Sequence, residues 1–263
     1  MLMRRQPTAT GADHRTPGAG GPTSSAVRLE SVTRIYGTGD NSVTALRDVS
    51  VTFPKGTFTA VMGPSGSGKS TFLHCAAGLD RPTSGQVYIG DVRLGGLNPT
   101  ELTELRRDRV GFVFQAFNLV PALNAWQNIL LPLRLSGRPL EDTWARELVE
   151  RIGMSDRVMH RPAELSGGQQ QRVAITRALV TRPDVVFADE PTGNLDSHTS
   201  EEILELLRHA VDEYGQTVVM VTHDPRAAAW ADSAVFLLDG RVHATVEAPT
   251  AESLADRMGR LEE

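Results

Sequence analysis

Lysine and cysteine are almost missing from this chain of 263 residues. Only Lys55 and Lys69 are lysines among its 27 basic side chains; the rest are arginines, which a preference for arginine codons explains. Cys75 is the single cysteine, which excludes an internal disulfide framework and gives no reason to expect an oxidising compartment.

Long apolar runs and an excess of positive charge are also lacking. No run approaches the roughly 18 apolar residues that cross a bilayer, and the first residues lack the apolar segment of a signal peptide, so neither is expected. A formal net charge of −5 gives no electrostatic reason to bind nucleic acid, and no nucleic-acid partner is expected.

The length allows one compact α/β domain or two small ones, since domains average about 150 residues. Residues 1–26 are half glycine, proline, threonine and serine, without apolar periodicity, and are expected to form a disordered tail. Residues 246–263 are expected to be a short, weakly helical C-terminal tail.

Between these ends, the apolar pattern predicts strands that alternate with helices. The predicted strands are 27–32, 46–53, 57–62, 110–114, 185–188, 217–221 and 234–238. The runs 185–188 and 217–221 are continuously apolar, which is typical of parallel strands covered on both faces. From 115 to 182 the pattern is helical only (124–135, 140–152 and 168–181), which predicts a helical subdomain of about 116–182 inserted into an α/β domain.

A glycine-rich loop follows the third predicted strand. Its sequence fits the phosphate-loop pattern of Gly, four residues, then Gly-Lys-Ser, and the candidate nucleotide-binding residues are Gly63, Pro64, Ser65, Gly66, Ser67, Gly68, Lys69, Ser70 and Thr71. Glycines let backbone N–H groups turn toward phosphate oxygens, Lys69 reaches the β- and γ-phosphates, and Ser70 is placed to ligate Mg²⁺. The alternative is a glycine turn that happens to contain a lysine.

Two carboxylates end the buried strand at 185–188. Asp189 is predicted to lie near the Mg²⁺ ion, and Glu190 is the candidate base that polarises the attacking water. Taken alone, such a pair is more often a cap or a turn, but beside a phosphate loop it indicates hydrolysis of a nucleoside triphosphate.

A second candidate anion site precedes the predicted helix 168–181. It consists of Leu165, Ser166, Gly167, Gly168 and Gln169. Ser166 is a favourable N-cap, and the two glycines leave bare N–H groups at the helix start. A plain capped helix, the alternative, does not explain the paired glycines.

This segment resembles the signature motif of ATP-binding-cassette (ABC) ATPases, and the order of motifs agrees along residues 27–245. The resemblance implies a P-loop NTPase cassette over 27–245, with a mixed sheet core, an N-terminal antiparallel β portion and the inserted helical subdomain. It also implies ATP and Mg²⁺ as cofactors and ATP hydrolysis as the activity.

Further roles come from matching positions. Tyr36 matches the aromatic that stacks on adenine, and Val43 is placed on the same base. Gln115 matches the residue that contacts Mg²⁺ and the attacking water, Asp196 links the two active sites, and His223 reaches the γ-phosphate. The alternatives are a half-exposed strand-end aromatic for Tyr36, a cap for Gln115, a helix N-cap for Asp196, and a satisfied strand-end histidine for His223.

In this family the signature of one subunit closes over the nucleotide of another. One copy of each motif therefore implies a homodimer or a related ATPase subunit as partner. The resemblance also implies that this chain is attached peripherally to the cytoplasmic face of the cell membrane through a separate transmembrane permease. Residues 115–125 and 188–197 resemble the lipoprotein-release and macrolide-efflux branch, which implies export or extraction of hydrophobic cargo.

Trp126 is either a core residue or part of the permease-docking surface. The alternative functions are a non-transport ABC ATPase acting on cell-division or DNA-associated machinery, and a phosphotransferase.

Overall fold

The computed structural model describes residues 25–137 and 142–262. Most of the predicted N-terminal tail lies outside these residues. Its last two, Ser25 and Ala26, begin the first strand, β1 (Ser25–Tyr36), two residues earlier than the sequence predicts, and Ala26 is fully buried. The strand extends this far because Ser25 pairs with Pro54 and the Ala26 carbonyl accepts a hydrogen bond from the N–H of Gly90.

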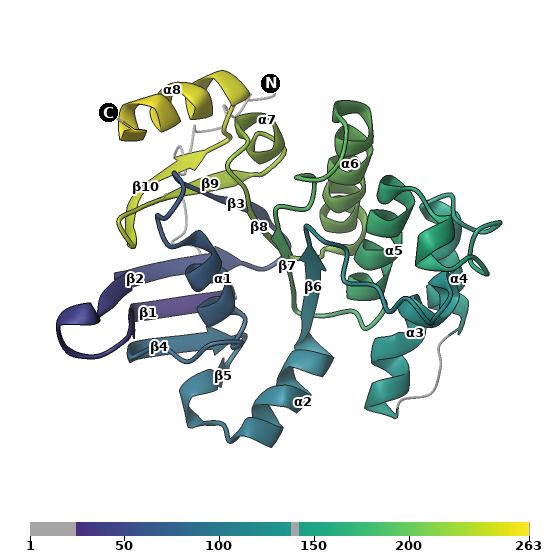
Figure 1. Ribbon diagram of the computed structural model, residues 1–263, viewed down its shortest axis with the longest axis horizontal. Helices are drawn as coiled ribbons and strands as arrows, with labels where there is room; N and C mark the ends of the chain where they lie inside the picture. The colour runs from purple at the N-terminus through teal and green to yellow at the C-terminus, as the bar shows by residue number, and fades with distance from the viewer. Residues whose placement is uncertain (1–24, 138–141, 263) are drawn as a thin grey trace, which may run out of the picture.

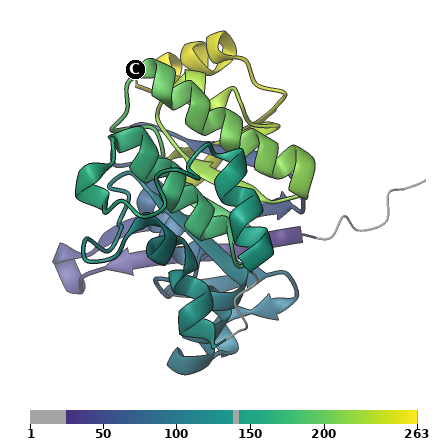
Figure 2. The same cartoon turned by 90° about the vertical axis from the view of Figure 1, so that its right-hand side faces the viewer.

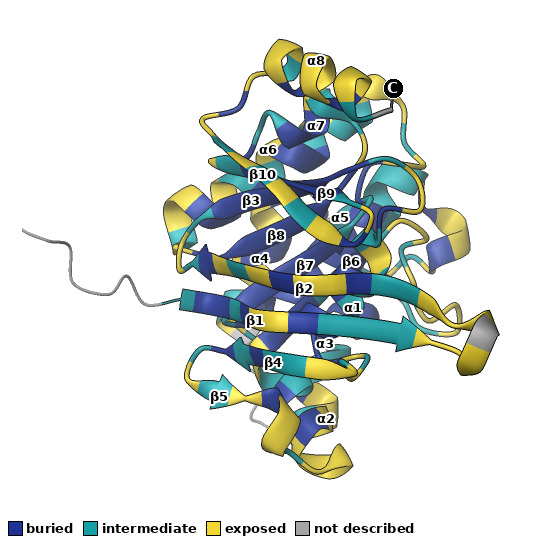
Figure 3. Cartoon of the chain, turned by 90° about the vertical axis from the view of Figure 1, so that its left-hand side faces the viewer, coloured by how far each residue is buried: buried dark blue, intermediate teal, exposed yellow. Residues whose placement is uncertain are grey.

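Four strands form an antiparallel sheet in the order β2-β1-β4-β5. β1 pairs with β2 (Val43–Pro54) on one side and with β4 (Ser84–Ile89) on the other, and β5 (Val92–Arg93) follows β4. Figure 3 shows these strands side by side. The antiparallel N-terminal portion expected from the resemblance is confirmed.

A second sheet has six strands in the order β10-β9-β3-β8-β7-β6. Their bounds are β3 (Phe58–Met62), β6 (Val110–Phe114), β7 (Val185–Asp189), β8 (Val218–Val221), β9 (Ser233–Leu238) and β10 (Arg241–Glu247). All neighbouring pairs are parallel except β9 and β10, so the predicted mixed sheet is confirmed. The carboxyl ends of the five parallel strands meet at one edge, where ligands bind in open α/β sheets.

The helix α1 (Lys69–Ala76) joins the two sheets. Its Phe72 and Leu73 are fully buried and share one core with Phe53 of β2 and Phe187 of β7. Figure 1 shows α1 against the antiparallel sheet, and the Phe53 and Phe72 ring centroids are 5.9 Å apart. The antiparallel sheet and the parallel strands are therefore anchored on the helix that starts at the phosphate loop.

Three helices between β6 and β7 correspond to those that the sequence predicts. They are α3 (Ala125–Ser136), α4 (Asp142–Arg151) and α5 (Gly167–Leu179), with the short helix η3 (Pro162–Glu164) before α5. Figures 1 and 2 show them gathered at one side of the six-stranded sheet. Buried Ile129, Leu148 and Val173 join them in one core.

The remaining helices complete the chain: η1 (Gly39–Asn41), η2 (Leu94–Gly96), α2 (Pro99–Arg109), α6 (Ser197–Tyr214), α7 (Pro225–Ala228) and α8 (Ala251–Glu262). The segment predicted as a C-terminal tail contains the end of β10 and α8, in which Leu254 is fully buried and Met258 nearly so. Within the described ranges, no helix has the length and apolar character needed to cross a membrane.

Candidate functional site

An open pocket of about 760 Å³ lies at the carboxyl edge of the parallel strands. Its walls come from the start of β2, the glycine-rich loop, the start of α1, the segments after β7 and β8, and α8. The lining residues are Val43, Thr44, Ala45, Pro64, Ser65, Gly66, Gly68, Lys69, Ser70, Thr71, Glu190, His223 and Met258. The fold therefore brings together most of the predicted phosphate-binding residues with Glu190 and His223.

Two glycines of the loop are required by close packing. A Cβ added at Gly63 would lie 2.1 Å from the carbonyl oxygen of Leu237, and one added at Gly68 would lie 2.5 Å from that of Ala45. Gly68 also has a φ of 100° as the N-cap of α1. The loop is thus pressed between β9 and β2, and the N-terminal end of α1 faces the pocket.

Lys69 folds back over this loop. Its Nζ donates hydrogen bonds of 2.8 Å to the carbonyl oxygens of Gly63 and Pro64, which leaves one of three ammonium hydrogens for a ligand. Burial lowers the pKa of Lys69, while the carboxylates of Glu190 and Asp189 oppose that shift. The buried Ser67 hydroxyl has no hydrogen-bond partner in the described part of the chain. Unused donors in a loop with these glycines fit an anionic ligand.

The carboxylate of Glu190 is held by the segment that follows β8. Its Oε1 lies 2.7 Å from Nδ1 of His223, and its Oε2 accepts a hydrogen bond of 3.1 Å from the Thr222 hydroxyl. Glu190 has a φ of 46°, a left-handed conformation that is strained for a residue with a side chain. Its N–H donates to the carbonyl of Val221, so the parallel pairing of β7 with β8 fixes this turn.

Asp189 lies at the last position of β7, beside Glu190. Burial raises the pKa of Asp189, the neighbouring Glu190 charge raises it further, and His74 and Lys69 oppose the shift. Such a carboxylate is stabilised when a cation lies next to it.

Gln115 follows β6, whose last residue, Phe114, pairs with Asp189. Gln115 Nε2 lies 3.2 Å from Oδ1 of Asn194, and Asn194 Nδ2 donates to the Gln115 carbonyl at 3.0 Å. Asn194 is a contact that the sequence analysis does not assign. Its place within residues 188–197, a segment that resembles the lipoprotein-release and macrolide-efflux branch, was the available signal.

The signature segment begins α5. Ser166 Oγ accepts a hydrogen bond from the N–H of Gln169, and Gln169 Oε1 accepts one from the N–H of Ser166, so the predicted N-cap is confirmed. A Cβ added at Gly168 would lie only 2.4 Å from Cγ2 of Thr199 in α6. None of these residues lines the phosphate-loop pocket of the same chain.

Asp196 caps α6, which is the alternative kept open for it. It accepts hydrogen bonds from the N–H and the hydroxyl of Thr199, at 3.0 and 2.7 Å. These bonds hold the pKa of the Asp196 carboxyl below its ordinary value. Its role between two active sites stays a prediction.

Tyr36 and Val43 face each other across β1 and β2. Val43 is 64% exposed and lines the pocket, whereas Tyr36 is not among the lining residues. The Tyr36 hydroxyl donates to Asp80 at 2.7 Å, and the Arg34 guanidinium lies 4.3 Å from its ring centroid. Arg34 and Asp80 thus hold the side chain of Tyr36 in place. From the sequence alone, Tyr36 is predicted only to lie at the end of a strand.

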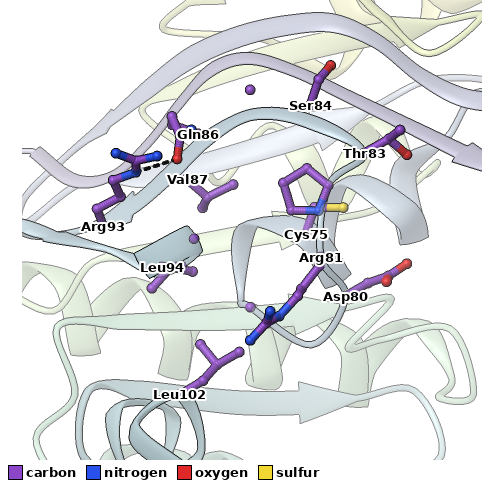
Figure 4. A pocket seen from close by; sticks show the side chains of 14 residues that line it. Cys75, Asp80, Arg81, Thr83, Ser84, Gln86, Val87, Arg93, Leu94 and Leu102 are labelled. Carbon is purple, nitrogen blue, oxygen red and sulfur yellow. Dashed lines mark hydrogen bonds between the residues drawn. The ribbon is translucent and has the colours of Figure 1, made fainter. Parts of the chain in front are cut away.

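A separate pocket of about 350 Å³ lies between α1, β4, η2 and α2 and is shown in Figure 4. Cys75 lies in its wall and is 1% exposed, as expected for a small buried residue. Burial raises the pKa of its thiol to about 12. This chemistry gives Cys75 no part in hydrolysis.

A glycine-rich loop after β3, an acidic pair after β7 and a helix N-terminus between the two sheets define a P-loop nucleoside triphosphatase. The protein-family comparison is more specific, since the model described as "ABC transporter" matches residues 46–193, more than half of the chain.

Curated relatives agree. The chain is 46% identical over 227 residues to "Uncharacterized ABC transporter ATP-binding protein MJ0796" of Methanocaldococcus jannaschii, covering 82% of this chain and 94% of that protein. It is 44% identical over 221 residues to "Lipoprotein-releasing system ATP-binding protein LolD" of Geobacter metallireducens, covering 83% and 98%. It is 41% identical over 230 residues to "Macrolide export ATP-binding/permease protein MacB" of Bdellovibrio bacteriovorus, covering 85% of this chain but 35% of that longer protein.

Among solved structures, the chain is similar to one described as a dimeric, post-hydrolysis state of the MJ0796 cassette bound to ADP and Pi. The TM-score is 0.77 at 43% identity, covering 84% of this chain and 98% of that one. This chain belongs to the ABC transporter family, as an ATP-binding cassette. It is an ABC ATPase of the type that includes LolD and MacB.

Proposed function

We propose that this ATPase works as a dimer around two ATP molecules, lies at the cytoplasmic face of a membrane and drives a separate membrane-spanning permease. The observation that carries the catalytic part is the Glu190 carboxylate, held by His223 and Thr222 in the pocket that contains Lys69. The transport part is supported by the LolD and MacB relatives, which favour a transport subunit over a cell-division or DNA-associated ATPase.

In the proposed reaction, the loop amides and Lys69 bind the β- and γ-phosphates. Glu190 accepts a proton from the attacking water, and its two hydrogen-bonded neighbours keep the carboxylate oriented. Nδ1 of His223 is used by Glu190, so Nε2 is the ring atom that would reach a γ-phosphate oxygen. Val43 and Tyr36 would hold the adenine, with Arg34 on the Tyr36 ring.

A magnesium ion fits at the border of this pocket, where Ser70 lines the wall, Asp189 ends β7 and Gln115 follows the neighbouring strand β6. Ser70, Asp189 and Gln115 offer a hydroxyl, a carboxylate and an amide oxygen, which suit a hard cation. Burial and the neighbouring Glu190 charge raise the pKa of Asp189, so a cation beside this carboxylate would stabilise its ionised form. When bound, Mg²⁺ would neutralise charge on the phosphates.

The dimer would complete each site. Leu165–Gln169 lie away from the phosphate loop of their own chain, and their capped helix start offers N–H groups to an anion held by a second copy. The dimeric MJ0796 cassette supports this arrangement. Asp196, next to that helix start through Thr199, would then link the two sites.

The permease would dock beside α3 and α4. A pocket of about 310 Å³ there is lined by Trp126, Arg146, Val149, Glu150, Ser155, Val158 and Met159, and Met159 is 72% exposed. Trp126 also packs against the core, so the two alternatives for it are compatible. The lining combines buried or half-buried apolar side chains and the exposed Met159 with exposed charged residues, a mixture that suits a protein partner. The cargo, by likeness to the branch, would be hydrophobic.

Dimerisation is tested with Ser166→Arg in a Glu190→Gln background. We expect monomers that still bind ATP but no longer dimerise with it in size-exclusion chromatography, while the control Thr52→Arg, at an exposed position of β2, dimerises normally. Dimerisation of the Ser166 variant would contradict the shared site.

Co-purification of the chain with a multi-spanning membrane protein in detergent supports the transport role, and ATP hydrolysis stimulated by DNA would contradict it.

A further inference from the structure

The backbone just after Gln115 adopts an uncommon conformation. Phe117 and Asn118 have φ values of 60° and 50°, so two consecutive residues with side chains lie in the left-handed region. This conformation is costly, above all for a bulky aromatic residue. It persists only where surrounding groups hold it in place.

Arg177 of α5 is the group that holds this turn. Its Nη1 donates to the carbonyl oxygen of Asn118 at 2.6 Å, and its Nη2 donates to that of Phe117 at 3.0 Å. A single planar guanidinium thus engages both strained residues, as its fork geometry allows.

The guanidinium is partly buried, and burial lowers its pKa. Within the described residues its hydrogen bonds go to these two carbonyls, with no ion pair to a carboxylate. A desolvated charge with neutral partners is expensive unless its geometry is specific. The arginine is therefore costly as a mere packing residue and suited to fixing one backbone geometry.

The same helix carries further contacts to the catalytic segments. Gln171, fully buried on α5, donates through Nε2 to the carbonyl of Pro191, next to Glu190, at 2.6 Å. A Cβ added at Gly167, at the start of α5, would lie 3.6 Å from the Phe117 ring. The turn after Gln115 is thus hydrogen-bonded to the signature helix α5 through Arg177, and its Phe117 ring lies close to the start of the same helix.

We propose that Arg177 is a positioning residue for ATP hydrolysis, which fixes the backbone that carries Gln115 to the signature helix α5. Gln115 would then lie beside the metal ion and the attacking water only when α5 is correctly positioned against the six-stranded sheet. The inference rests on the proposed role of Gln115. Arg177 itself touches neither the nucleotide pocket nor its lining residues.

The test compares Gln115→Ala, Arg177→Met and the double variant in the full chain, by ATP hydrolysis at varied ATP and Mg²⁺ concentrations and, without turnover, by Mg²⁺ titration of the ADP-bound chain, in which Arg177→Met should bind Mg²⁺ more weakly. Loss of an outer-shell partner lowers metal affinity or activity by about 10- to 100-fold. For Arg177→Met we expect a loss of this size in kcat, a higher Mg²⁺ concentration at half-maximal rate, and a KM for ATP within about twofold of the unmodified chain. In the double variant, Arg177→Met should add less than about twofold to the loss caused by Gln115→Ala.

The control is Arg106→Met, since Arg106 also donates to a backbone carbonyl, that of Gly78, but at α2, away from the site. It should keep the kcat and the Mg²⁺ response. If Arg177→Met fails to fold, Arg177→Lys replaces it, with the same changes in smaller size expected because the fork is lost. Unchanged kcat and Mg²⁺ response in a folded Arg177 variant, or losses that multiply in the double variant, would overturn the inference. No loss in Gln115→Ala would instead overturn the proposed role of Gln115.

Discussion

Glu190 Oε1 lies 2.7 Å from Nδ1 of His223, while its Oε2 accepts a hydrogen bond from the Thr222 hydroxyl. Both partners come from the segment after β8, and β8 is the parallel neighbour of β7. Sheet register therefore sets the direction of the carboxylate. Any change that weakens this pair should affect the rate of hydrolysis more than the binding of ATP.

The His223 contact is tested by His223→Ala. Among the described residues, the variant leaves Thr222 as the one hydrogen-bonding neighbour of the carboxylate. We therefore expect kcat to fall by at least about tenfold. The KM for ATP should change less than kcat, because His223 would supply one γ-phosphate contact while the phosphate loop and Lys69, which supply the others, are untouched. Steady-state kinetics measure both, and a KM effect without a kcat effect would contradict the assigned role.

Lys69→Ala should weaken nucleotide binding itself. In the proposed reaction this lysine is the cation that reaches the phosphates. Charge-assisted hydrogen bonds contribute about 1.5–3 kcal/mol each, which corresponds to roughly 10- to 150-fold in affinity. Fluorescent-nucleotide titration measures the change. The chain provides its own control, since Lys55 is its only other lysine and is exposed, and Lys55→Ala should bind normally. Equal affinity in both variants would contradict the phosphate-loop assignment.

Gly168→Ala should destabilise the start of α5. The new methyl group would lie 2.4 Å from Thr199 Cγ2, and overpacking of this kind costs about 1–3 kcal/mol. Thr199→Ser removes that methyl and keeps the hydroxyl that donates to Asp196. Urea unfolding should therefore show recovery in the double variant. No recovery would mean that Gly168 is needed for another reason.

Cys75 should stay unreactive in the folded chain at neutral pH. Its pKa is raised from 9.0 to about 12, so the thiolate is scarce. Ellman's reagent should label it only after unfolding. Because the folded pKa is the higher one, the thiol contributes stability fully below about pH 9, and that contribution is lost as the pH rises from 9 to 12. The stability of Cys75→Ala should depend less on pH over that window.

The predicted strands largely agree with the structure because their apolar runs are buried. The apolar pattern did not predict β10, an edge strand whose Arg241, His243 and Thr245 are exposed. It gave only a weak helix where α8 lies, because few residues of that helix pack inward. The phosphate loop and the acidic pair were predictable because each is contiguous in sequence.

Long-range contacts were not predictable from the same patterns. Tyr36 with Asp80, Gln115 with Asn194, and Arg177 with Phe117 each join segments far apart in the chain. Local patterns fix the elements, but these pairs depend on how the elements pack. In the sequence, nothing distinguishes Arg177 from the other residues of the predicted helix 168–181.

The measurement that tests the account most directly is ATP hydrolysis and ATP binding by Glu190→Gln. The amide keeps the shape of the side chain but is no base, and loss of a general base costs about 10²- to 10⁴-fold. We predict hydrolysis lowered by at least about 100-fold, with ATP affinity within about twofold of the unmodified chain. Hydrolysis at the unmodified rate would contradict the assignment of Glu190 and, with it, the mechanism proposed for this site.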